Sequence, residues 1–170
     1  AAKTVAGSMF FNQGESCNAP SRVLVHRAVA DRFVEMVAAE APNYQPGDPL
    51  SGSAQMGAIV DETQLRTVLG YIEAGKSEGA RLACGGAQVR ADTGGYFVQP
   101  TVFDGVTSGM RIAREEIFGP VACVLRADDD EHALALANDT PFGLCAGICT
   151  TSLKHATQFK RRAQVGMVMV

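Results

Sequence analysis

The sequence has 170 residues, of which 46% are hydrophobic and 19% charged, with a formal net charge of −3. That length suits one domain with a substantial buried core. The mild negative charge argues against nucleic acid or an anionic membrane as a partner. No apolar run approaches the roughly 20 residues that span a bilayer.

The hydrophobic pattern predicts alternating helices and strands. Turn-forming residues separate them, above all the prolines and glycines of the 42–49 segment. We expect helices over residues 1–12, 28–41 and 61–79, after about 130 and after 152, and strands over 22–26, 81–84, 97–103, 121–125, 145–150 and 165–170.

Local signals support several of these elements. Asp61 can cap a helix in which Leu65, Val68 and Ile72 share one face. The run 121–125 is apolar throughout, as in a central strand covered on both faces. The sequence therefore predicts an α/β fold with a mostly parallel open sheet and helices on both faces.

The five cysteines are widely spaced and odd in number. A chain of this size does not need disulfides, so we expect free thiols in a reducing cytoplasm. Cys145 and Cys149 would share one face of a buried strand. Because no CxxC pair or histidine pair accompanies them, we expect no metal site.

Cys17 stands apart from the other four. Gly14 precedes it by three residues and permits a sharp turn between a helix and a strand. A thiol in such a turn is open to substrate, and its own backbone N–H can face a developing oxyanion. The alternative interpretation is that Cys17 is simply a small buried hydrophobic residue.

Four segments of the chain carry a recognisable pattern: Phe10–Arg22, Gly95–Val102, Arg114–Val121 and Ala137–Leu144. The first, which contains Cys17, resembles the nucleophile segment of the aldehyde dehydrogenase superfamily, and the other three resemble that family in the same order along the chain. The resemblance covers nearly all 170 residues and implies that they form part of a catalytic domain.

The resemblance implies roles for four residues. Cys17 would be the nucleophile that forms a thiohemiacetal and then a thioester. Glu116 and Gln64 would bind the ribose next to nicotinamide, and Phe118 would pack near the nicotinamide ring of NAD or NADP. Without the resemblance, Glu115 and Glu116 would be a solvated acidic pair and Phe118 a core residue. Glu15 is expected to be structural, because a carboxylate near Cys17 would raise the thiol pKa.

The resemblance also implies how the chain relates to its parent. Residues 1–170 would be a partial catalytic domain without the dinucleotide-binding domain and oligomerisation segment, inactive alone, from a homodimeric or homotetrameric parent. Its substrate would be a small aldehyde, and the 43–50 segment is most similar to relatives that oxidise gamma-glutamylaminobutanal. The alternatives are a coenzyme-A-acylating aldehyde dehydrogenase and a non-catalytic binding or structural module.

Overall fold

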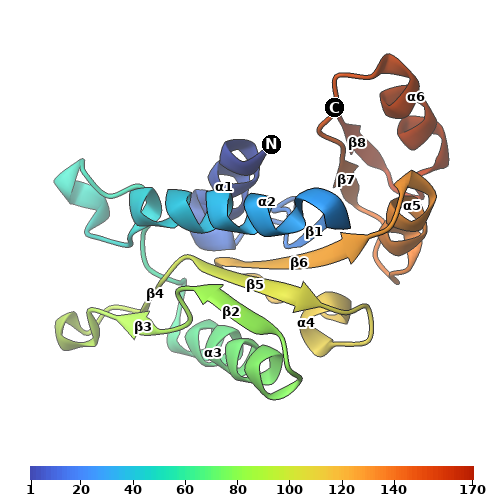
Figure 1. The fold of residues 1–170 in the computed structure, drawn as a ribbon. Coiled ribbons are helices and arrows are strands. Elements are labelled where there is room, and N and C mark those ends of the chain that lie inside the picture. Colours follow the sequence, from blue (N-terminus) through green and yellow to red (C-terminus); the bar gives the residue numbers. More distant parts are fainter.

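A four-stranded sheet forms the centre of the computed structural model, which describes every residue from Ala1 to Val170. Its strands are β1 (Arg22–His26), β2 (Arg81–Cys84), β5 (Thr101–Val106) and β6 (Val121–Ala127). Their order in the sheet is β1-β6-β5-β2 (Figure 1). Strands β1 and β5 both run parallel to β6, and β2 runs antiparallel to β5 at the edge. The predicted mostly parallel open sheet is confirmed.

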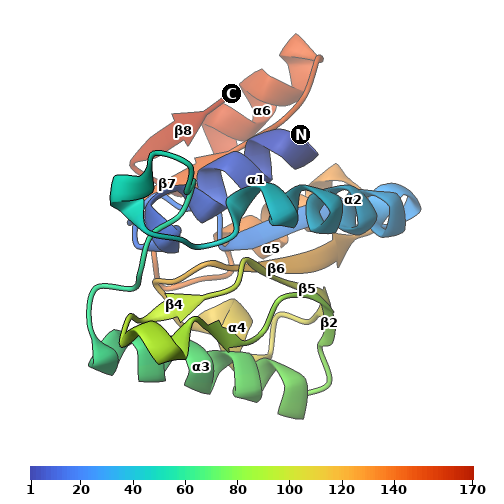
Figure 2. The same ribbon diagram turned by 90° about the vertical axis from the view of Figure 1, so that its left-hand side faces the viewer.

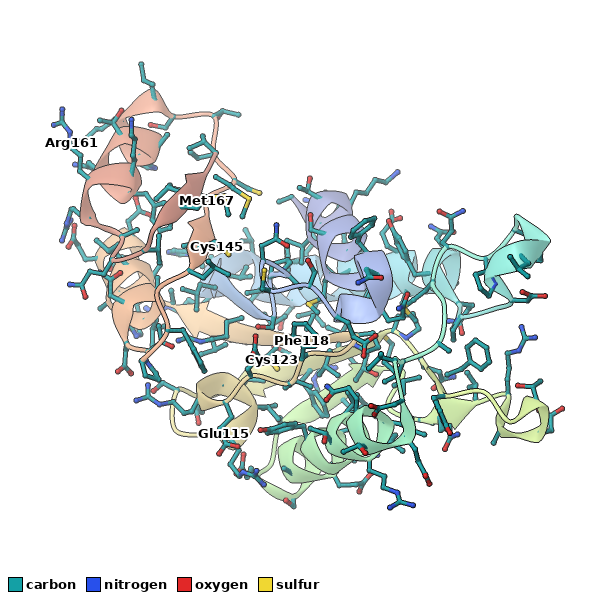
Figure 3. The ribbon with its side chains drawn as sticks, turned by 180° about the vertical axis from the view of Figure 1, so that it is seen from behind. Glu115, Phe118, Cys123, Cys145, Arg161 and Met167 are labelled. Atoms are coloured by element: carbon teal, nitrogen blue, oxygen red, sulfur yellow. The ribbon has the colours of Figure 1, made fainter.

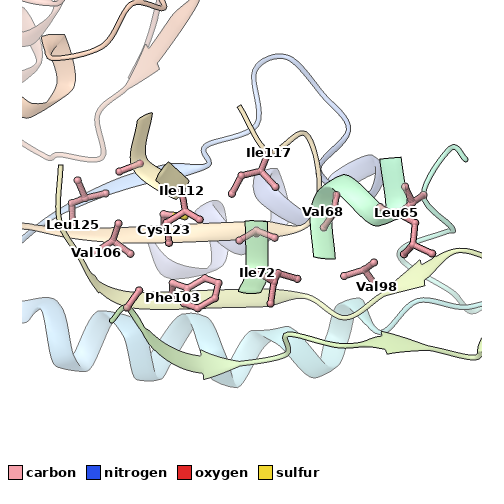
Figure 4. Packing of buried hydrophobic residues seen from close by; sticks show 14 residues of the cluster. Leu65, Val68, Ile72, Val98, Phe103, Val106, Ile112, Ile117, Cys123 and Leu125 are labelled. Carbon is pink, nitrogen blue, oxygen red and sulfur yellow. The ribbon is translucent and has the colours of Figure 1, made fainter. Parts of the chain in front are cut away.

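Helices cover both faces of this sheet (Figures 1 and 2). Helices α1 (Ala2–Phe10) and α2 (Arg27–Glu40) lie on one face, and α3 (Glu62–Ser77) and α4 (Arg111–Arg114) lie on the other. Successive residues of a strand point to opposite faces, so each strand supplies both layers. Val102 packs in the cluster with α1 and α2, whereas its neighbour Phe103 packs with Ile72 of α3 (Figure 4).

The local signals for α3 are confirmed. The Asp61 carboxylate accepts a hydrogen bond of 2.8 Å from the Gln64 backbone N–H. Leu65, Val68 and Ile72 are buried against the sheet. The cap and the apolar stripe therefore fix both where this helix begins and which face it buries.

The predicted 97–103 strand is in fact two strands in different sheets. β4 (Phe97–Val98) pairs with β3 (Gln88–Val89), whereas β5 belongs to the central sheet. Pro100 lies between them, and the Thr101 N–H donates to the Pro120 carbonyl at 2.8 Å. Since proline cannot donate a ladder hydrogen bond, the chain changes partner at that residue.

Residues 145–170, here called the C-terminal arm, stand apart from the central sheet. The arm consists of β7 (Cys145–Gly147), α6 (Leu153–Arg162) and β8 (Met167–Met169), with β7 and β8 paired in a separate parallel sheet. α5 (Asp130–Asn138) leads into it. The prediction of a buried strand over 145–150 was wrong, because β7 ends at Gly147 and is half-buried to exposed. Its only partner strand is β8.

The remaining elements are four short 3-10 helices: η1 (Phe11–Gly14), η2 (Ala41–Tyr44), η3 (Pro49–Ser51) and η4 (Ala91–Thr93). None of the helices combines the length and apolar character needed to cross a bilayer. No group of three or more His, Cys, Asp or Glu side chains gathers in a way that could hold a metal ion.

A buried carboxylate joins β5 to its neighbouring strands. Asp104 Oδ2 accepts hydrogen bonds of 2.7 Å from Arg81 on β2 and from Arg126 on β6. Burial alone would raise the pKa of Asp104, but the hydrogen bonds from Arg126 and Arg81 outweigh it and lower the pKa. The charged form of Asp104 therefore stabilises the folded state.

We expect Asp104→Asn to lower the free energy of unfolding at neutral pH by about 2 kcal/mol, measured by urea titration, because a charge-assisted acceptor is lost. The pKa of Asp104 is depressed by folding, so its contribution is complete above the unfolded pKa, about 3.9, and declines as pH falls through the folded pKa. The difference in the free energy of unfolding between wild type and Asp104→Asn should accordingly become smaller in acid. A gap unchanged down to the acid transition would contradict this assignment.

Candidate active site

The segment between α1 and β1 reverses direction through three consecutive left-handed residues. Asn12, Gln13 and Gly14 have φ angles of 48°, 58° and 71°. A Cβ atom on Gly14 would lie 2.2 Å from the Gly119 carbonyl oxygen. Only glycine fits this position, so the predicted role of Gly14 in the turn is confirmed.

Cys17 lies in the next turn, which the Ala19 N–H closes by donating to the Ser16 carbonyl at 3.0 Å. The Cys17 side chain is exposed. Its backbone N–H donates to no acceptor within the chain. The thiol and an available N–H donor thus occupy the same short turn, as a nucleophile with an oxyanion donor requires.

A cleft of about 1280 Å³ opens beside this turn. Cys17, Glu116 and Leu144 all border it, and the C-terminal arm supplies much of the opposite wall. Figure 3 shows Cys145 and Met167 on that arm and Phe118 below, near the centre of the molecule. The structure therefore brings the predicted nucleophile and one predicted cofactor residue to a common cleft.

Exposure does not by itself single out Cys17, because Cys149 is also exposed and borders the same cleft. What sets Cys17 apart from Cys149 is therefore its place in the turn after Gly14 and not its exposure. The other three thiols are less available. Burial raises the pKa of Cys123 to about 12 and also raises the pKa of Cys84. The pKa of Cys145 is raised by burial and by the proximity of Cys17.

The two adjacent carboxylates that follow α4 differ sharply. Glu115 accepts hydrogen bonds from Arg111 and from the Tyr71 hydroxyl, and these bonds lower its pKa. Glu116 is exposed and forms no hydrogen bond or ion pair, although both carboxylates border the cleft. A carboxylate with both oxygens available can bind a vicinal diol, so Glu116 fits the nicotinamide ribose and Glu115 does not.

The other two predicted cofactor residues, Phe118 and Gln64, contact each other through hydrogen bonds to the Phe118 turn. Phe118 is 38% exposed with a φ of 54°. The Gln64 amide nitrogen donates to the carbonyls of Ile117 and Phe118, at 3.0 and 2.8 Å. Gln64 therefore holds the Phe118 turn, and only its amide oxygen is left to accept a bond from a ribose.

Phe118 does not border the large cleft. It borders a shallow hollow of about 360 Å³ together with Asn12, Gln13 and Glu15. Of the four predicted site residues, the structure brings Cys17 and Glu116 to one cleft. Phe118 and Gln64 lie together on the neighbouring turn.

Two hydrogen bonds to the segment just before Cys17 have no signal in the sequence. The Gly57 N–H donates to Gln13 Oε1, and the Val60 N–H donates to Glu15 Oε1, both at 3.2 Å. These partners lie 44 and 45 positions apart along the chain. No local periodicity or turn signal reports such a pairing, so only the folded structure reveals it.

The fold and the comparison with known proteins together assign the chain to one family. The chain belongs to the aldehyde dehydrogenase family, whose model matches residues 1–170. This membership confirms the resemblance carried by the motifs around Cys17 and Phe118.

Similar proteins include enzymes of several named activities. The chain is 44% identical over 167 residues to betaine aldehyde dehydrogenase of Mesorhizobium japonicum, covering 95% of this chain and 34% of that protein. It is 45% identical over 163 residues to mitochondrial aldehyde dehydrogenase of Homo sapiens, covering 96% and 31%. The chain thus spans about a third of the length of these relatives.

Solved structures agree closely with the fold. An indole-3-acetaldehyde dehydrogenase in complex with NAD+ superposes with a TM-score of 0.97 at 49% identity, covering 99% of this chain and 34% of that one. Gamma-glutamyl-gamma-aminobutyraldehyde dehydrogenase from Burkholderia cenocepacia superposes with a TM-score of 0.96 at 52% identity, with the same coverage.

Proposed function

We propose that the full-length protein oxidises an aldehyde to a carboxylate with NAD, and that Cys17 is its nucleophile. The observation that carries this proposal is the exposed Cys17 thiol, with its unpartnered N–H, in a cleft that it shares with the free carboxylate of Glu116. Family membership and the solved relatives in complex with NAD+ support it.

The proposed chemistry begins at the Cys17 sulfur. The thiolate attacks the aldehyde carbon and forms a C–S bond, while the carbonyl oxygen becomes an oxyanion that accepts a hydrogen bond from the Cys17 N–H. A bound NAD would supply the acceptor for the hydride on this carbon. Cys17 then carries an acyl group as a thioester, and attack by water releases the carboxylate and restores the thiol.

Three residues would hold the cofactor. Glu116 has two carboxylate oxygens free for the ribose hydroxyls, and the exposed part of the Phe118 ring can pack against nicotinamide. The amide oxygen of Gln64 is free to accept a further ribose hydroxyl. We propose NAD rather than NADP because several of the solved relatives are complexes with NAD+.

The 170 residues would supply the nucleophile but not the whole reaction. We place the general base, a second oxyanion donor and the dinucleotide-binding domain in other parts of the parent, because the chain spans about a third of its relatives. We therefore expect the 170 residues alone not to catalyse aldehyde oxidation. We further propose a cytoplasmic homodimer or homotetramer acting on an amino-aldehyde, since a gamma-glutamyl-gamma-aminobutyraldehyde dehydrogenase is 52% identical.

The test is aldehyde oxidation by the full-length protein with gamma-glutamylaminobutanal, betaine aldehyde or propanal. We expect NADH and the free carboxylate in equal amounts, and fastest turnover with gamma-glutamylaminobutanal. Coenzyme A is the informative addition. An acyl-coenzyme-A product formed in place of the carboxylate would show the acylating type, and no NADH with any aldehyde would contradict the proposed oxidation.

A further inference from the structure

The backbone immediately before Cys17 is held in an unfavourable conformation. Asn12 and Gln13 are not glycines, yet both have φ angles in the left-handed region. Side chains disfavour that region, so such residues persist only where the surrounding structure over-determines them. Contacts with other residues must therefore hold Asn12 and Gln13 in this conformation.

One set of contacts lies within the turn. The Asn12 side-chain amide donates to the Glu15 carbonyl at 2.8 Å, and the Glu15 N–H donates to the Asn12 carbonyl at 2.9 Å. Both partners belong to the same few residues. These bonds shape the turn but cannot fix it relative to the rest of the molecule.

A second set ties the turn to a distant segment. Gln13 and Glu15 each accept a backbone N–H through a side-chain oxygen, from Gly57 and Val60 respectively, both at 3.2 Å. Residues 57–60 lead directly into α3. Ile59 between them is buried, and its N–H donates to the Tyr96 carbonyl at 2.8 Å. The 57–60 segment, to which Gln13 and Glu15 bind, is thus itself held by the protein core.

The anchored turn also touches the turn that carries Phe118. Gly14 packs against the Gly119 backbone so closely that a Cβ would overlap it. Gln13 and Glu15 border the same hollow as Phe118. The side chains of Gln13 and Glu15 therefore lie where the Cys17 turn, the 57–60 segment and the Phe118 turn meet.

We propose that Gln13 and Glu15 are positioning residues, which hold the Cys17 turn through their bonds to the Gly57 and Val60 backbone. This inference rests on the proposed role of Cys17 as nucleophile. Their action is indirect: neither side chain needs to touch substrate. Because one Glu15 oxygen is committed to a peptide N–H, the carboxylate acts here as an acceptor rather than as a base.

The experiment uses four variants of the full-length protein. Glu15→Leu and Gln13→Leu remove the two acceptors, and Glu15→Gln keeps an acceptor oxygen without the charge. Glu62→Leu is the matched control, because Glu62 is an exposed carboxylate close to Val60 in sequence that pairs only with Arg66. Three quantities are measured: hydrogen–deuterium exchange of the peptide spanning residues 56–61, the pre-steady-state rate of NADH formation, and the KM for NAD.

We expect Glu15→Leu and Gln13→Leu to speed exchange of that peptide by about tenfold, the effect of losing one hydrogen bond. The rate of NADH formation should fall by about tenfold while the KM for NAD changes less than about twofold, because orientation of the thiol is lost and cofactor binding is not. Glu15→Gln should restore the exchange and the NADH rate to within about threefold of wild type. Glu62→Leu should change neither.

Two outcomes would overturn the inference. Unchanged exchange in both leucine variants would mean that the bonds are not formed, and faster exchange with an unchanged NADH rate would mean that they only support the fold. Failure of the proposed function is distinct, because it would appear in wild type as no NADH and no acylated Cys17. Circular dichroism of each variant identifies any that does not fold, and the other leucine variant then carries the test.

Discussion

Replacing Cys17 with serine in the full-length protein is expected to lower the rate of aldehyde oxidation by about a thousandfold or more, as when a nucleophile that acts with its partners is removed. A hydroxyl is far less acidic than a thiol, so serine supplies almost no anionic nucleophile near neutral pH. The size of the two side chains is similar, and Cys17 is exposed, so the fold should survive. The measurement is steady-state NADH formation.

Cys149→Ser is the matched control for that variant. Cys149 is also an exposed thiol that borders the cleft, but it lies on the C-terminal arm, away from the left-handed turn. We expect Cys149→Ser to keep nearly full activity. If the two variants lost activity equally, the turn geometry would not be what selects the nucleophile. Full activity in Cys17→Ser would remove Cys17 from the mechanism altogether.

Elements with local signals could be predicted well from the sequence. The helix α3 was found from one capping residue and an apolar stripe, Asp61 followed by Leu65, Val68 and Ile72. The helix predicted after residue 152 is α6, and the Ser152 hydroxyl caps it by accepting a hydrogen bond from the His155 N–H at 3.3 Å. Caps and stripes act within a few residues, so a short window of sequence contains all the information they need.

Strand boundaries depend on partners that a short window does not contain. The extended run from Phe97 looks continuous, but β4 and β5 pair with different strands. The strand from Cys145 looks buried because it is apolar, yet β7 pairs only with β8 and stays half-exposed. In both places the decisive contact lies far away in the sequence, which is why the prediction failed there.

The candidate site divides in the same way. Cys17 and Glu116 were found because their motifs resemble a family, and the structure brings them to one cleft. The hydrogen bonds that the Gln64 side-chain amide donates to the Phe118 turn were not predicted, and neither was the hydrogen bond from the Val60 N–H to the Glu15 carboxylate. These contacts position the site across 45 or more residues, so a motif identifies the reacting group without showing what holds it.

The free carboxylate of Glu116 is expected to have a large effect on the rate of hydride transfer. Glu116→Gln in the full-length protein is expected to slow hydride transfer by roughly ten- to a hundredfold, the range for loss of a charge-assisted hydrogen bond. An amide offers one acceptor oxygen where the carboxylate offers two and a charge. Since Glu116 is exposed and forms no bond within the chain, the substitution should leave the fold intact.

The control for Glu116→Gln is the adjacent substitution, Glu115→Gln. Glu115 is committed to Arg111 and Tyr71, so its loss should affect stability modestly and hydride transfer little. Two rates separate the roles: single-turnover NADH formation at saturating NAD, and acylation of Cys17 by an activated ester, which needs no nicotinamide. We expect Glu116→Gln to slow the first and spare the second, because a loosely held ring is poorly placed for hydride transfer. If hydride transfer in Glu116→Gln matched wild type, Glu116 would be an ordinary surface carboxylate, and the cofactor would have to be held by other residues.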